Sequence, residues 1–200
     1  MCGISGLFNF TNRNIEAKEI ISKIVKAQNL RGPDDNSQWQ SDCKKVLFGH
    51  NRLSIIDLST NGKQPFISLD NNFIITFNGE IYNFKEIKKE LISKNIKFRS
   101  NSDTEVIIES YKFWGLEFLN KLRGMFSFAL WDDLSKKLIL ARDPFGIKPL
   151  YYSIKNGVCY FASQVKSFKS INEISNEKSE AGTVSFFMWG HVQEPSTLYK

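Results

Sequence analysis

The cysteine at position 2 could act as a nucleophile because of where it stands in the chain. Met1 is commonly removed when the second residue is small, and its removal would place the thiol of Cys2 beside a free α-amino group. Such an amine titrates near roughly 7.7 to 8.0, so it can accept the thiol proton and leave a thiolate that attacks a carbonyl carbon. A cysteine after the initiator is more often incidental, so Cys2 alone does not predict catalysis.

The other cysteines and the histidines suggest no further chemistry. Cys43 and Cys159 form no C-x-x-C pair and have no histidine at ligand spacing, so the sequence predicts neither a metal site nor a disulfide framework. We expect both cysteines to be packing residues and the chain to occupy a reducing compartment. His50 and His191 are expected to be structural, because an N-terminal amine would already supply the base.

The composition predicts a folded, cytoplasmic protein. Hydrophobic residues make up 42% and charged residues 24% of the 200 residues, which excludes collagen-like and wholly disordered chains. No apolar run approaches the roughly 18 residues of a spanning helix, and the N-terminus lacks a signal-peptide pattern, so no membrane contact is expected. The net charge of +6 comes largely from basic residues between 85 and 99. Apolar residues alternate with them at helical spacing. This pattern favours the solvent-exposed face of an amphipathic helix over a surface that binds nucleic acid.

Alternating and helical patterns predict the elements that must position Cys2. The expected strands of the first half are 4–10, 45–49, 53–57 and 73–77, and the expected helices are 15–29, 84–95 and 104–114. Ser102 and Asp103 are expected to cap the last of these helices. The second half predicts hairpins from strands 126–131, 137–141, 150–154 and 158–162. This order favours an α+β domain with two antiparallel sheets covered by helices.

The C-terminal part differs in composition from the rest. Residues 170–183 are polar and are predicted to form a surface linker. Residues 184–199 are aromatic again but too few to build a core. We therefore expect one domain over residues 2–169, followed over 170–200 by a linker and the start of a second, truncated domain.

Six blocks in a fixed order carry a family resemblance. They are MCGISG (1–6), RGPDD (31–35), RLSIIDL (52–58), FNGEIYN (77–83), SDTE (102–105) and ARDPFGIKPLYY (141–152). Together they resemble the N-terminal glutaminase domain of glutamine-hydrolysing asparagine synthetases, a class II glutamine amidotransferase. The resemblance covers about residues 2–165 and implies a four-layer αββα sandwich of the N-terminal nucleophile hydrolase type. Leu30 stands where this family usually has a histidine.

The resemblance implies that Asn78 and Gly79 form an oxyanion hole, from the asparagine side-chain amide and the glycine backbone N–H. Such donors stabilise the charge that develops on an attacked carbonyl oxygen, and losing one typically costs roughly 100 to 1,000-fold in rate. In isolation, an Asn-Gly dipeptide more commonly indicates a hairpin turn.

The resemblance also implies a binding site for glutamine. The guanidinium of Arg52 would hold the α-carboxylate, a task that suits its planar fork, and Glu80 and Asp103 would hold the α-ammonium. The backbone that would line the pocket belongs to Leu53, Ser54, Ile55 and Ile56. Asp103 could instead serve only as a helix cap. Residues 31–35 are expected to form a loop near the site or a plain turn, and residues 142–152 are expected to be architectural.

The resemblance further implies a covalently linked C-terminal synthetase domain that uses ATP and Mg²⁺ to make asparagine from aspartate, with no cofactor in this fragment. Relatives of this branch amidate other carboxylates, including sugar acids, and the acceptor residues would lie beyond Lys200. A homodimer is one assembly that the resemblance allows. The remaining alternative is a non-catalytic assembly or regulatory module of the same fold. Such a module would be expected to have lost the nucleophile, whereas this sequence has Cys2, Arg52, Asn78, Gly79 and Asp103.

Overall fold

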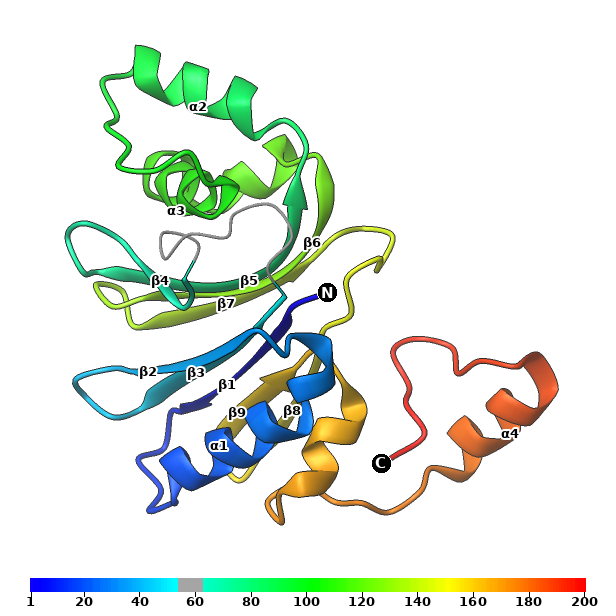
Figure 1. Cartoon of the computed structure of the whole chain (residues 1–200). Helices are drawn as coiled ribbons and strands as arrows, with labels where there is room; N and C mark the ends of the chain where they lie inside the picture. Colours follow the sequence, from blue (N-terminus) through cyan, green and yellow to red (C-terminus); the bar gives the residue numbers. More distant parts are fainter. Residues whose placement is uncertain (54–62) are drawn as a thin grey trace.

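Two antiparallel sheets packed face to face form the centre of the computed structural model, which describes residues 1–53 and 63–200 (Figure 1). The first sheet has the strand order β2-β3-β1-β9-β8 and the second has the order β4-β5-β6-β7. The strands of the first sheet are β1 (Gly3–Asn9), β2 (Asp35–Gln40), β3 (Val46–Arg52), β8 (Tyr151–Lys155) and β9 (Val158–Ala162). Those of the second are β4 (Phe66–Ile67), β5 (Phe73–Ile81), β6 (Gly124–Asp132) and β7 (Lys137–Arg142).

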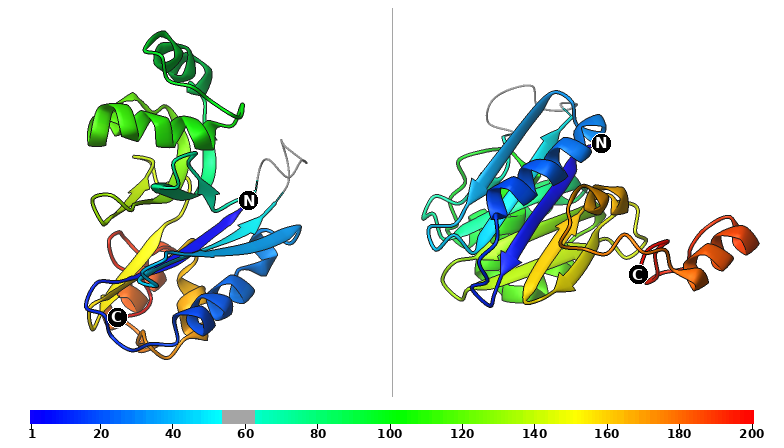
Figure 2. Two further views of the ribbon diagram at one scale, coloured as in Figure 1. Left: turned by 90° about the vertical axis from the view of Figure 1, so that its left-hand side faces the viewer. Right: turned by 90° about the horizontal axis from the view of Figure 1, so that it is seen from below.

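Helices cover the outer face of each sheet, as Figure 2 shows from the side. The first sheet is covered by α1 (Ala17–Ala27) and by the 3-10 helix η4 (Val165–Ser170). The second is covered by α2 (Phe84–Ser93), α3 (Asp103–Trp114) and the 3-10 helix η3 (Gly115–Lys121). A short 3-10 helix, η1 (Asn29–Arg31), follows α1. Since the sheets meet through a third core that includes Phe48, Trp131 and Phe161, the predicted four-layer αββα sandwich is confirmed.

Strand alternation decides which side chains enter the space between the sheets. In β5, Ile75 and Phe77 pack with the helices of the second sheet, whereas Ile74 packs between the sheets. In β3, Val46 and Phe48 likewise pack between the sheets. Because side chains of a strand alternate in direction, the residues that follow at even numbers on both strands point into the same interlayer space.

Most expected helices and strands are confirmed, with boundaries shifted by a few residues. Ser102 caps α3, since its Oγ accepts a hydrogen bond from the backbone N of Thr104 at 3.1 Å. The expected strand over 53–57 lies almost wholly outside the described residues, and β3 ends at Arg52. The sequence patterns missed β2, whose residues are polar, and β4, which is very short.

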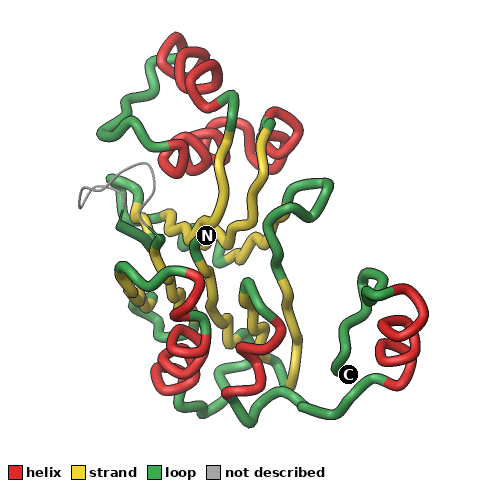
Figure 3. The backbone as a smooth tube through the Cα atoms, turned by 45° about the vertical axis from the view of Figure 1, so that its right-hand side comes forward, coloured by secondary structure: helices red, strands yellow, loops and turns green. Residues whose placement is uncertain are grey.

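Three expectations are wrong. Cys43 is exposed rather than packed, although Cys159 is buried as expected. The expected linker contributes two core residues, Ile171 and Ile174, which pack against the layer of α1. A further helix, α4 (Glu180–Trp189), begins inside the expected linker, and Ser179 caps it. Figure 3 shows that α4 lies apart from the sandwich. No helix in the described parts of the chain is long and apolar enough to cross a membrane.

Candidate functional site

Cys2 lies directly before β1, where this strand pairs with the end of β3. Gly3 is opposite Asn51 in the register of the two strands, so continuing this register by one residue places Cys2 opposite Arg52 and next to Leu53. The backbone N of Leu53 donates a hydrogen bond to the Cys2 Sγ at 3.4 Å, and the thiol lies 3.7 Å from the Leu53 carbonyl oxygen. The thiol is only partly buried, and Figure 1 shows the N-terminus near one end of the sandwich. Cys2 and Leu53 are therefore brought together as expected.

Arg31 holds the main chain of Cys2 in place. Its Nε donates a hydrogen bond to the Cys2 carbonyl oxygen at 3.0 Å, and burial lowers the pKa of its guanidinium. The adjacent Gly32 packs so closely on β3 that an added Cβ would lie 2.4 Å from the carbonyl carbon of Asn51. The loop over 31–35 is thus no plain turn. Sequence reasoning gave Arg31 no role, and its place in the RGPDD block was the only signal.

Arg52 and His50 point toward the second sheet, on the same face of β3 as Phe48. His50 is buried, and burial is the main cause that lowers its pKa to about 4, so the ring is neutral near pH 7. The Arg52 carbonyl oxygen accepts a hydrogen bond from the backbone N of Asp34 at 3.1 Å. Arg52 is half-buried at the end of β3, and the register of β1 with β3, continued by one residue, places it opposite Cys2.

Asn78 and Gly79 lie within β5, so they do not form the hairpin turn that the dipeptide alone would indicate. Asn78 is 4% exposed, and its Nδ2 has no hydrogen-bond partner among the described residues. Two residues earlier on the same face, Thr76 donates a hydrogen bond from Oγ1 to the Gly49 carbonyl oxygen of β3. This contact aligns the end of β5 with the end of β3. The amide of Asn78 therefore faces the interlayer space at the end where Cys2 lies.

Gly79 has to be a glycine for a steric reason. An added Cβ would lie 2.4 Å from the carbonyl oxygen of Met125 and 2.7 Å from the Cα of Phe126, both on the neighbouring strand β6. Real side chains do not tolerate such distances from backbone atoms.

Glu80 and Asp103 bring two carboxyl groups together at the end of β5. Asp103 is the first residue of α3, and its Oδ2 accepts a hydrogen bond from the backbone N of Ile81 at 3.1 Å. Burial raises the pKa of Asp103, and the nearby Glu80 carboxylate raises it further, against the opposing effect of backbone donors. A cation bound between these two carboxylates would stabilise their charged forms, because one of them is desolvated and the two repel each other.

Ser54, Ile55 and Ile56, which were expected to line the pocket with their backbone, lie outside the described residues. Leu53 is the one member of that set that the structure describes.

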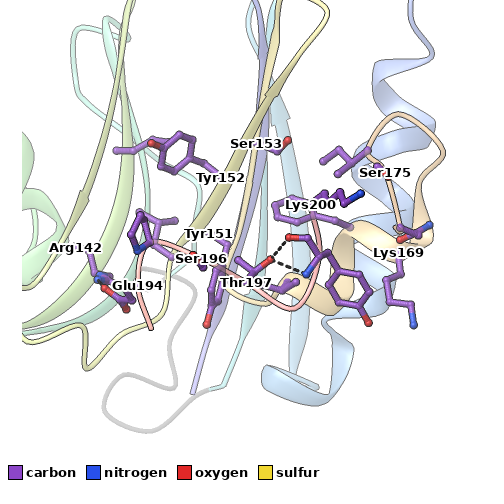
Figure 4. A pocket seen from close by; sticks show the side chains of 18 residues that line it. Arg142, Tyr151, Tyr152, Ser153, Lys169, Ser175, Glu194, Ser196, Thr197 and Lys200 are labelled. Atoms are coloured by element: carbon purple, nitrogen blue, oxygen red, sulfur yellow. Dashed lines mark hydrogen bonds and ion pairs between the residues drawn. The ribbon is translucent and has the colours of Figure 1, made fainter. Parts of the chain in front are cut away.

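The block over 142–152 forms a rigid turn around Asp143. This buried carboxylate accepts hydrogen bonds from the backbone N atoms of Phe126, Phe145, Ile147 and Lys148. The preceding Arg142 pairs with Glu194 of the C-terminal segment, with 2.8 Å between Nη1 and Oε1. A cavity of about 530 Å³ lies between β7, β8 and that segment, and Figure 4 shows this ion pair at its edge. None of the expected site residues that the structure describes lines this cavity.

Comparisons with known proteins agree with this architecture. A family model described as a glutamine amidotransferase domain matches residues 1–200. Asparagine synthetase [glutamine-hydrolyzing] 1 of Bacillus subtilis is 42% identical over an alignment of 201 positions, which covers 99% of this chain and 31% of the relative. Amidase chry2 of Gibberella zeae is 41% identical over 177 residues, covering 84% of this chain and 26% of the relative. The chain thus spans about a third or less of these relatives.

A solved structure of similar fold is the glutamine phosphoribosylpyrophosphate amidotransferase of B. subtilis, complexed with ADP and GMP. Its TM-score is 0.70 at 22% identity, over 84% of this chain and 43% of that chain. This likeness confirms the N-terminal nucleophile hydrolase type of sandwich. The match over the whole chain shows that it belongs to the glutamine amidotransferase domain family.

Proposed function

We propose that this chain hydrolyses glutamine to glutamate and ammonia, with the thiolate of Cys2 as the nucleophile. The observation that carries the proposal is the position of Cys2 beside the end of β3, at the same end of the sandwich as a buried asparagine amide with an unused donor. A nucleophile and a fixed hydrogen-bond donor are the two groups that attack on an amide requires.

The reaction follows from these groups once Met1 has been removed. The α-amine of Cys2 takes the thiol proton, and the sulfur forms a bond to the side-chain carbonyl carbon of glutamine. The carbonyl oxygen becomes an oxyanion, which the Asn78 Nδ2 and the Gly79 N–H would bind. The C–N bond then breaks, the ammonium of Cys2 returns the proton, and ammonia leaves. Water hydrolyses the thioester and restores the thiol, so one glutamine and one water give one glutamate and one ammonia.

The two ends of glutamine would bind on either side of this centre. Arg52 would pair with the α-carboxylate, and Glu80 with Asp103 would bind the α-ammonium. The raised pKa of Asp103 supports this assignment, because a bound ammonium ion would relieve the cost of its buried charge. Arg31 would keep the main chain of Cys2 fixed during attack.

The fate of the ammonia belongs to the part of the protein beyond this chain. We propose that residues 2–169, together with the buried Ile171 and Ile174, form the glutaminase domain. The rest of residues 170–200 would lead into a synthetase domain, which would use ATP and Mg²⁺ to amidate aspartate. Relatives named amidases match at 41% and 38% identity, so amidation of another carboxylate is the second candidate.

Glutamine hydrolysis without ATP tests the proposal. Protein that has lost Met1 should release ammonia from glutamine, and Cys2→Ala should release none while still binding glutamine in a calorimetric titration. Cys43→Ala is the matched control, because this exposed thiol lies outside the proposed site and its loss should leave the rate unchanged. Ammonia release by Cys2→Ala, or by protein that retains Met1, would contradict the assignment of nucleophile or base.

A further inference from the structure

Ser127 lies directly opposite Asn78 in the pairing of β5 with β6. It is fully buried, and its Oγ has no hydrogen-bond partner among the described residues. The Asn78 Nδ2 shares this property. The Ser127 Oγ can accept a hydrogen bond and the Asn78 Nδ2 can donate one, and the two residues are neighbours. Both groups are buried, where a polar group without a partner costs free energy of desolvation.

Both side chains point to the same side of the sheet. Their neighbours in β6 alternate, since Phe126 and Phe128 pack with the helices and Ala129 packs between the sheets. Ser127 therefore faces the interlayer space, as Asn78 does. Directly opposite residues of an antiparallel pair have Cβ atoms about 4.5 to 5.5 Å apart, which allows their polar ends to meet after a rotation of either side chain.

The other neighbour of Ser127 has a different partner. Arg142 is opposite Ser127 on β7, so the three residues form one row across the sheet. The Arg142 guanidinium, however, forms two hydrogen bonds to the Glu194 carboxylate. The Asn78 amide, by contrast, is an adjacent donor that is buried and has no partner among the described residues.

We propose that Ser127 is a positioning residue for the oxyanion donor, an inference that rests on the proposed function. A carboxamide nitrogen carries two hydrogens. The Ser127 Oγ accepts one of them, which fixes the plane of the Asn78 amide. The second hydrogen then points at the place where the carbonyl oxygen of glutamine acquires its charge. Ser127 itself does not touch the substrate.

This arrangement predicts a particular kinetic signature. A freely rotating Asn78 amide would still bind the uncharged carbonyl of glutamine weakly. It would stabilise the oxyanion less well, because fixing the plane of the amide would then cost free energy during the reaction. Loss of the Ser127 hydroxyl should therefore lower kcat and leave KM nearly unchanged. Since a neutral hydrogen bond is worth little net free energy, the expected fall in kcat is roughly 2- to 10-fold.

The test compares Ser127→Ala with the wild type in glutamine hydrolysis, and it includes Ser110→Ala and Ser167→Ala as matched controls. Both control serines are buried and have an Oγ without a partner in the described parts of the chain, but they lie in α3 and η4. All three changes delete one buried hydroxyl, so a merely structural effect should appear similarly in each. The free energy of unfolding of every variant is measured in urea.

A second readout is the affinity for an aldehyde analogue of glutamine, which forms a tetrahedral adduct with the Cys2 thiolate. We expect Ser127→Ala to weaken this affinity by the same factor as it lowers kcat, with the controls at the wild-type values. An unchanged kcat, a rise in KM alone, or an equal loss in the control variants would overturn the proposal for Ser127. A wild type that hydrolyses no glutamine would instead overturn the proposed function, and the inference with it.

Discussion

Arg52 and Asp103 are single residues whose chemistry can be changed without changing their shape greatly. Arg52→Lys keeps the positive charge at the end of β3 but removes the planar fork that pairs with both oxygens of a carboxylate. We expect KM for glutamine to rise roughly 10-fold or more, because hydrogen bonds to charged groups are the stronger ones. Steady-state kinetics and urea midpoints check this together. A large loss of stability with an unchanged KM would make Arg52 a structural residue instead.

Asp103→Asn separates binding from stability. The isosteric amide oxygen can still accept the hydrogen bond from Ile81, but the charge that would bind the α-ammonium is lost, so KM should rise roughly 10- to 100-fold. The folded state raises the pKa of Asp103, which means that the charged carboxylate costs stability at neutral pH and the protonated form does not. The variant should therefore unfold at a higher temperature than the wild type near pH 7.

The difference in melting temperature should shrink as the pH falls below the raised pKa of Asp103 toward the ordinary range of aspartate, where the wild type is also neutral. Ser102→Ala, which removes the cap of α3 but no charge, should show no such pH dependence. A variant that is less stable than the wild type at pH 7 would mean that the Asp103 charge is compensated within the fold.

At this scale, the candidate site could be proposed from the sequence because each expected residue belongs to a block with a characteristic order of side chains. Arg31 was in such a block but was given no role, because its contact is to a backbone oxygen of Cys2 and no pattern of residue types encodes that. Ser127 lies outside the blocks, and only the register of β5 and β6 brings it next to Asn78.

At the scale of elements, β5 has to allow the close approach of β6 at Gly79 and also has to place the Asn78 amide at the candidate site. Its Asn-Gly pair sits in a strand because Gly79 alone allows β6 to approach so closely. Local turn preference could not reveal this, since the decisive contact is with a residue far away in sequence. The missed strand β2 has the same explanation, because its polar residues are held at the edge of the sheet by pairing with β3.

Gly79→Ala should therefore destabilise the fold as well as the reaction. A methyl group at this position would collide with the backbone of β6, and overpacking of this kind typically costs about 1 to 3 kcal/mol. Gly3→Ala is the control, because an added Cβ there meets its nearest atoms at 3.4 to 3.5 Å, an ordinary contact distance. Urea denaturation of both variants should show a clear loss of stability in the first alone.

His50, in β3, makes the free energy of unfolding depend on pH. The pKa of its buried ring is lowered to about 4, so the folded state resists a proton that the unfolded chain accepts near the ordinary value of 6.5. Stability is fully present above pH 6.5 and is lost as the pH falls from there toward 4. The full loss attributable to His50 is about 3 kcal/mol. His50→Gln, which does not titrate, should flatten this part of the pH profile of the free energy of unfolding, and an unchanged slope would contradict the assignment.

At the scale of the whole molecule, the two sheets and the helices that cover them could be predicted from the sequence. The C-terminal boundary of the domain could not. Periodicity and turn residues indicated two sheets under helices, since each layer needs an apolar face. Residues 170–183 were predicted to form a linker because they are mostly polar. The two isoleucines among them were too few to predict burial from the sequence, and only the structure shows that they pack with the core residues of α1.

A test of the domain boundary follows from those two side chains. Ile171 and Ile174 are buried against the layer of α1, whereas α4 lies apart from the sandwich and exposes Phe187 and Trp189. A chain ending at residue 169 loses both isoleucines, and one ending at residue 178 keeps them and loses only α4 and the residues after it. Burial of one such side chain contributes roughly 1.5 to 3 kcal/mol, so the shorter chain, which loses two, should be less stable by about 3 to 6 kcal/mol. The chain ending at residue 178 should match residues 1–200 in urea denaturation, because α4 adds little to the sandwich. Equal stability of the two shortened chains would show that residues 170–178 are a linker after all, and the domain would then end where the sequence alone places it.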